Sequence, residues 1–213
     1  MYEKWISNFL TNVNNFYLVI YTDNHSVSML YKYINNNPKI KVVLIPIHNF
    51  YNIKYKDKWI KNQKDNIYLK KIEWKVNMLW CEKISFVKNA FKENYFNTDW
   101  FGWCDIGYFR GDNNDMTKQQ LTSWPNHNVI NQLNKTKIHY ANICNNVKYF
   151  NKLISIVKDK NVNNLPRTAI PPDQMSIAGG FFLIYKDKID WWHKTFDERL
   201  QLYFNYNYLV KDD

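Results

Sequence analysis

The sequence predicts an α/β domain in which a mostly parallel central sheet is flanked by helices on both faces. Short runs of β-branched and aromatic residues alternate with longer segments whose apolar residues recur at helical spacing. The 213 residues are enough to bury a full core without disulfides or metals. No apolar run of about twenty residues is present, so no transmembrane segment is expected. We therefore expect one domain over residues 1–213, and the abrupt acidic ending indicates a domain cut from a longer protein.

The first half of the chain contains two pairs of helix and strand. Residues 2–11 have a helical pattern, and residues 16–21 form an apolar run typical of a buried strand. Residues 26–35 predict a second helix, which ends at a run of asparagines and a proline. Residues 40–45 are rich in β-branched side chains and predict the second strand, with a proline at its end.

Strands and helices continue to alternate in the second half. Strands are predicted over residues 100–104, 137–143 and 181–185, helices over residues 67–94, 147–158 and 187–204, and polar loops over residues 106–135 and 160–175. Strands that alternate with helices are typical of parallel βαβ units. Ligands of such folds bind at the C-terminal ends of the strands, which selects Thr22, Asp23 and Asp105.

The formal charge of +10, from 29 basic and 19 acidic residues, favours anionic partners. Nucleic acid, anionic lipid and phosphorylated small molecules all qualify. An alternative source of part of this charge is a codon bias toward Lys, Asn, Ile and Tyr, so the composition alone does not select among these partners. Aromatic residues make up 18% of the chain, and their flat faces suit the rings of sugars and bases.

The three cysteines, Cys81, Cys104 and Cys144, are too few and too scattered for a disulfide framework or a zinc site. The N-terminus lacks the basic, apolar and small-residue order of a signal peptide. We therefore expect a reducing compartment, the cytoplasm.

Asp105 is the strongest single candidate for a functional residue, because it directly follows an apolar strand and precedes Ile106 and Gly107. A carboxylate at this position projects into the ligand crevice, and the glycine lets a bulky ligand approach the backbone. Such oxygen ligands suit Mn²⁺ or Mg²⁺ bridged to a diphosphate. The alternative is an aspartate that caps the following turn. Arg110 could pair with phosphate or form a surface salt bridge.

Two stretches carry a family resemblance. The first runs from Trp80-Cys81-Glu82-Lys83 through residues 97–110, which end in Asp105-Ile106-Gly107-Tyr108-Phe109-Arg110, and the second is Gly179-Gly180-Phe181-Phe182. Together they resemble the HtrL/YibB-like family, with the elements in order over residues 16–213. The family is similar to GT-A glycosyltransferases, and related domains occur in large DNA viruses of algae. The resemblance therefore implies a GT-A-like, Rossmann-like sheet and a nucleotide-sugar-dependent activity.

The resemblance also implies roles for individual residues. Asp105 stands at the metal-binding D-x-D element, although Trp103 occupies the place of its first Asp. Donor binding is implied for Thr22, Asp23, Lys83, Asp105, Gly107 and Arg110; acceptor and sugar binding for Asp173, Gln174, Gly179 and Gly180; and the general base for Asp212 or Asp213. Structural alternatives exist: Lys83 as a helix-surface residue, Gly179-Gly180 as a tight turn, and the final acids as a frayed terminus.

The function predicted from these observations is transfer of a sugar from a nucleoside diphosphate, with UDP favoured, to a hydroxyl of a glycan or glycoprotein. A divalent metal, Mn²⁺ or Mg²⁺, is expected to assist. A rival from another class is a basic nucleic-acid-binding module, for which salt-sensitive binding would be diagnostic. A third possibility is an inactive sugar-binding domain, since the first Asp of the D-x-D element is missing.

Overall fold

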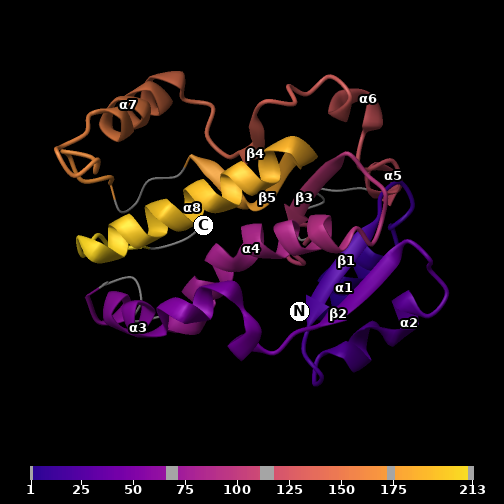
Figure 1. Ribbon diagram of the computed structural model, residues 1–213. Helices are drawn as coiled ribbons and strands as arrows, with labels where there is room; N and C mark the ends of the chain where they lie inside the picture. Colours follow the sequence, from indigo (N-terminus) through magenta and orange to yellow (C-terminus); the bar gives the residue numbers. More distant parts are fainter. Residues whose placement is uncertain (1, 66–71, 111–117, 172–175, 211–213) are drawn as a thin grey trace.

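The computed structural model describes residues 2–65, 72–110, 118–171 and 176–210 (Figure 1). The strands are β1 (Leu18–Thr22), β2 (Ile40–Leu44), β3 (Trp100–Cys104), β4 (Ile138–Asn142) and β5 (Ile177–Tyr185). The α-helices are α1 (Tyr2–Leu10), α2 (Tyr31–Ile34), α3 (Lys56–Asp65), α4 (Trp74–Glu93), α5 (Lys118–Thr122), α6 (His127–Ile130), α7 (Val147–Lys158) and α8 (Ile189–Asn205).

The prediction of a GT-A-like, mostly parallel central sheet is wrong. The described residues form two sheets, a parallel pair β1-β2 and a three-stranded antiparallel sheet in the order β3-β5-β4. Strand β5 runs antiparallel to both of its neighbours, so β3 and β4 share one direction on either side of it. The class is still α/β, but both strand pairs of the larger sheet are antiparallel and not parallel.

The connection from β4 to β5 explains the direction of β5. After β4 the chain passes through α7 and returns to the same end of the sheet, where Asn142 of β4 is the partner of Ile177 of β5. The next residue along confirms this return, because Ile143 N–H donates to the carbonyl of Ser176. A helix between two strands is usual for parallel pairs, but here the long segment after α7 brings the chain back instead of across.

Most of the predicted elements are present near the expected residues. The helix predictions over 2–11, 147–158 and 187–204 correspond to α1, α7 and α8. The segment predicted as helix over 26–35 is a 3₁₀ turn, Val27–Leu30, followed by the single α-helical turn of α2. Helix α3 was not predicted. The Gly179-Gly180 pair lies inside β5 and not in a turn before it.

Helix α4 lies at the centre of the molecule, between β3 on one side and α3 and α8 on the other (Figure 1). Its residues contribute to two of the three clusters of buried side chains, one with α3 and α8 around Trp59 and one with β5 and α8 around Ile184. The third cluster packs α1 against β1 and Phe109. Across the described ranges, no helix is both long enough and apolar enough to cross a membrane.

Candidate functional site

A buried lysine and a half-exposed aspartate form an ion pair between α4 and the end of β3. The Nζ atom of Lys83 lies 3.2 Å from Oδ2 of Asp105, and it also donates to the carbonyl of Gly179 at 2.9 Å. The Lys83 side chain is 6% exposed and that of Asp105 is 38% exposed. A buried ammonium needs such partners, because an unpaired charge in the interior is costly. The pair therefore holds the Asp105 carboxylate in a fixed position at the surface.

Trp103 fixes the second oxygen of the same carboxylate. Its Nε1–H donates to Oδ1 of Asp105. Residues two apart on a strand point to the same face, and this spacing could have identified the contact from the sequence. The Trp103 ring stacks on Phe86 with a centroid separation of 5.7 Å, and Phe86 stacks on Tyr21 of β1 at 4.6 Å. The carboxylate thus stands at the end of a stack of three aromatic rings.

The glycine pair of β5 lies directly beside Asp105. The Asp105 N–H donates to the carbonyl of Gly180 at 2.8 Å. A Cβ atom on Gly180 would lie 3.2 Å from Oδ2 of Asp105 and 3.4 Å from the ring of Tyr108. The absence of a side chain at this position therefore keeps space open beside the carboxylate. The antiparallel direction of β5 makes this contact possible, since it brings the start of β5 to the end of β3.

Gly107 and Arg110, which follow in the same turn, lie against the first helix. A Cβ on Gly107 would be 3.2 Å from two ring atoms of Trp5 in α1. The guanidinium of Arg110 stacks over the Trp5 ring at 4.9 Å, and its Nε–H donates to the carbonyl of Gly107 at 2.9 Å. Both residues therefore take part in the packing of α1, and Arg110 remains exposed to solvent.

Thr22 and Asp23 lie at the C-terminal end of β1, as predicted. The carbonyl of Thr22 accepts the N–H of Ile45, and the Asp23 carboxylate accepts the N–H groups of Ser26 and His25, each at 2.8 Å. These hydrogen bonds, the one from Ser26 first, lower the pKa of Asp23. Asp23 thus closes the turn after β1. The contacts within the described ranges do not join Thr22 or Asp23 to Asp105.

Four of the predicted site residues, Asp173, Gln174, Asp212 and Asp213, lie outside the described residues. Val210, which precedes Asp212 and Asp213, is held by hydrogen bonds to two asparagine side chains. The carbonyl of Val210 accepts from Nδ2 of Asn62 at 2.7 Å and of Asn77 at 2.8 Å, and its N–H donates to Oδ1 of Asn62. Asn77 and Lys83 both lie on α4, about 9 Å apart along its axis.

The described residues around Asp105 do not by themselves fit a divalent cation. One carboxylate oxygen accepts from Trp103 and the other lies beside the Lys83 ammonium, whose charge would repel a cation at Oδ2. In the described part of the chain, no group of three or more His, Cys, Asp or Glu residues is placed to hold a metal ion. The positive charge next to Asp105 is therefore supplied by Lys83.

Glu82, the neighbour of Lys83 on α4, is a buried carboxylate that was not predicted to have a role beyond the motif. It is 1% exposed. Its two oxygens accept from the N–H of Tyr51 at 2.6 Å, the N–H of Asn52 at 2.9 Å and Nδ2 of Asn52 at 2.8 Å. Burial raises its pKa, while the hydrogen bonds from Asn52 and Tyr51 act in the opposite direction. Glu82 therefore ties the 3₁₀ helix Tyr51–Tyr55 to the helix that carries Lys83.

A second polar cluster lies between α4 and α8. The hydroxyl of Ser85 and Nε2 of His193 are 3.3 Å apart, and both residues are buried. The His193 ring meets the Tyr51 ring edge-on at 4.6 Å. At the rim of the cluster, Asp197 accepts from Tyr55 at 2.9 Å and pairs with Lys54 at 3.0 Å. Because Ser85 and His193 are both buried, we interpret the pair as a structural link between the two helices.

The stability of the protein is expected to fall between pH 7 and pH 5 because of His193. Burial lowers the pKa of His193, and Lys88 and Lys54 add to this while Asp197 and Asp190 oppose it. The unfolded state therefore binds more protons, so stability is complete above the unfolded pKa of about 6.5 and is lost as the pH falls below it. Urea denaturation of wild type and His193→Gln across this range would measure it. If the free energy of unfolding depended on pH with the same slope in the two proteins, the prediction would be contradicted.

No family model, curated protein or solved structure matches the chain. The resemblance to the HtrL/YibB-like family, and the activity it implies, therefore stay predictions.

Proposed function

We propose that the protein is a glycosyltransferase that moves a sugar from a nucleoside diphosphate, with UDP favoured, to a hydroxyl of a glycan or glycoprotein. One observation carries the proposal. Lys83 of α4, Asp105 after β3 and the Gly179-Gly180 pair of β5 were each selected from sequence, and the structure brings all four into direct contact. They come from three segments that are far apart in the chain.

Asp105 is the residue that we expect to touch the donor. Its carboxylate is partly exposed although Lys83 and Trp103 each donate to one of its oxygens. A carboxylate has about four lone-pair sites, so it can accept further hydrogen bonds from sugar hydroxyls. Gly180 leaves room beside it, and the Tyr108 ring, 36% exposed, offers an apolar face on which a sugar ring can stack.

Lys83 and Arg110 supply positive charge. The buried Lys83 ammonium orients the Asp105 carboxylate and offsets charge that develops on the departing diphosphate. The exposed guanidinium of Arg110, three residues after Gly107, can pair with a phosphate in two hydrogen bonds. No step of the proposed mechanism runs through a metal, because the described donor set does not fit one.

The transfer reaction needs a base for the acceptor. The acceptor oxygen attacks the anomeric carbon, the bond from that carbon to the phosphate oxygen breaks, and the nucleoside diphosphate leaves with the electron pair. For an inverting reaction a carboxylate must take the acceptor's proton. We assign this role to Asp212 or Asp213, which follow the anchored Val210.

A cytoplasmic location belongs to the same proposal. All three cysteines are free thiols, which a reducing compartment would maintain.

The decisive experiment is a panel of UDP- and GDP-sugars, with and without Mn²⁺, read by thermal shift and by release of nucleoside diphosphate. We expect at least one donor to raise the melting temperature of wild type, and Asp105→Ala to abolish that shift relative to its own ligand-free melting temperature. The matched control is Asp99→Ala, an exposed aspartate just before the start of β3. If Asp105→Ala responds to every donor as Asp99→Ala does, the assignment is wrong.

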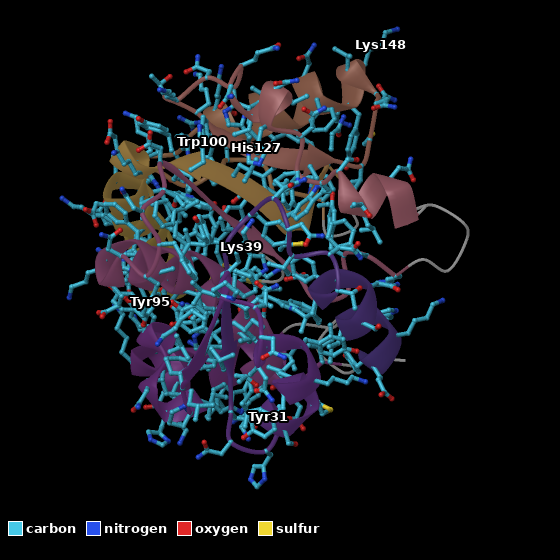
Figure 2. The ribbon with its side chains drawn as sticks, turned by 90° about the vertical axis from the view of Figure 1, so that its right-hand side faces the viewer. Tyr31, Lys39, Tyr95, Trp100, His127 and Lys148 are labelled. Atoms are coloured by element: carbon cyan, nitrogen blue, oxygen red, sulfur yellow. The ribbon has the colours of Figure 1, made fainter. Side chains whose placement is uncertain are left out.

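A second candidate function is binding of single-stranded nucleic acid. It is favoured by residues at the end of the sheets where β1, β2 and β3 begin, opposite to Asp105. There Tyr17 stacks on Phe96 at 4.5 Å, Lys41 lies over the Tyr95 ring and Lys135 over the Tyr185 ring. Figure 2 shows Lys39, Tyr95 and Trp100 on this side of the molecule. Interleaved lysines and aromatic rings are typical of such surfaces. Salt-sensitive binding of an oligonucleotide, with no response to any donor, would favour this function.

A further inference from the structure

Helix α7 exposes an apolar row to solvent. Val147 is 69% exposed, Ile154 47% and Val157 42%. At the helical repeat these three positions lie on one side of the helix. Only Leu153 of α7 is buried. Figure 1 shows α7 at the periphery of the molecule, away from α3 and α4.

A row of lysines lies beside the apolar row. Lys148 and Lys152 lie on the adjoining side of the helix, Lys158 falls between the two rows, and all three are exposed. Figure 2 shows Lys148 projecting away from the molecule. Residues 116–158 contain six lysines and no aspartate or glutamate, and Asp159, which follows the helix, pairs with Arg167 at 3.1 Å.

We propose that α7 binds the surface of an anionic membrane. The apolar row would enter the boundary between headgroups and acyl chains, while the three lysines would contact anionic headgroups, as in other basic amphipathic helices that lie in a membrane interface. Beyond the end of the helix, Val162 is a further apolar side chain that is 98% exposed. This membrane contact is independent of the proposed sugar transfer and does not require it.

The charge of the surface favours a membrane over a second copy of the chain. Two copies that met through α7 would bring Lys148, Lys152 and Lys158 of each chain close together. Like charges at an interface repel, and the whole chain already carries a formal charge of +10. An anionic lipid surface instead attracts every one of these lysines.

The test is co-sedimentation of the full chain with vesicles of phosphatidylcholine alone and of phosphatidylcholine mixed with phosphatidylserine. We expect binding only to the anionic vesicles, and weaker binding at high salt. The triple change Lys148→Gln, Lys152→Gln, Lys158→Gln should lower the affinity on the order of 100-fold, at about fivefold for each lysine. The triple change Val147→Ser, Ile154→Ser, Val157→Ser should lower it roughly tenfold or more.

The matched control removes the same charge from a different exposed helix, by Lys56→Gln, Lys61→Gln and Lys64→Gln on α3. It should bind anionic vesicles more than tenfold more tightly than the α7 lysine variant. Equal binding by the two lysine variants would overturn the proposal, because net charge alone would then explain it. So would vesicle binding that the α7 serine variant leaves unchanged, or self-association of wild type that this variant abolishes.

Discussion

Asp105→Ala is expected to lower the free energy of unfolding by about 3 kcal/mol, more than Lys83→Met does. Removing the carboxylate takes away the Asp105 oxygen that lies 3.2 Å from the ammonium of Lys83, which is 6% exposed, and breaking a buried pair in this way costs roughly 3–5 kcal/mol. Removing the lysine instead leaves a carboxylate that is 38% exposed and can be hydrated. The two halves of one ion pair therefore differ in effect because they differ in burial.

Urea denaturation of the two single variants and of the double variant Lys83→Met, Asp105→Ala would measure this difference. The double variant should be more stable than the sum of the single effects predicts, by about 1–3 kcal/mol. Additive effects, or a Lys83→Met variant less stable than Asp105→Ala, would show that the ion pair does not hold Lys83 in the interior.

Glu82→Ala is expected to be the most destabilising single change on α4, at about 4 kcal/mol. It leaves the N–H groups of Tyr51 and Asn52 without their acceptor beside a carboxylate that is 1% exposed, and the side-chain amide of Asn52 keeps only its bond to the carbonyl of Cys81. Each unsatisfied buried donor costs about 1–3 kcal/mol. The change also removes three of the hydrogen bonds that tie the 3₁₀ helix Tyr51–Tyr55 to α4.

Glu93→Ala, at the exposed end of the same helix, is the control for the loss of a glutamate from α4. It should change the free energy of unfolding by less than about 0.5 kcal/mol. Chemical denaturation of both variants at neutral pH is the measurement. A Glu82→Ala protein within about 1 kcal/mol of Glu93→Ala would contradict the anchoring role of Glu82.

The positions of most helices and strands follow from local patterns, but the sheet does not. A strand's sequence records which faces are buried and not its direction, so the antiparallel course of β5 was not predictable from alternation with helices. Helix α3 escaped prediction because, among its side chains over residues 56–64, only Trp59 and Asn62 are buried, which leaves no apolar periodicity to detect.

In the candidate site, too, the residues could be predicted from the sequence but the contacts between them could not. Asp105, Lys83 and the glycine pair were selected from motifs, but the contacts between them depend on β5 entering beside β3 in the reverse direction. The part played by Trp103 was readable from its two-residue spacing to Asp105. Glu82 carried no signal, because a charged residue on a helix is expected at the surface.

The sheet β1-β2 contacts α4 where the Tyr21 hydroxyl donates to the carbonyl of Phe86 at 3.0 Å and its ring stacks on Phe86, which in turn stacks on Trp103 of β3. The two sheets share no backbone ladder, so this junction of side chains can separate without breaking one. Any small molecule that touched both the end of β1 and the Asp105 carboxylate would bind only the closed form. The bound molecule would then hold the two sheets together, and the resistance of the protein to proteolysis would rise with the concentration of that molecule.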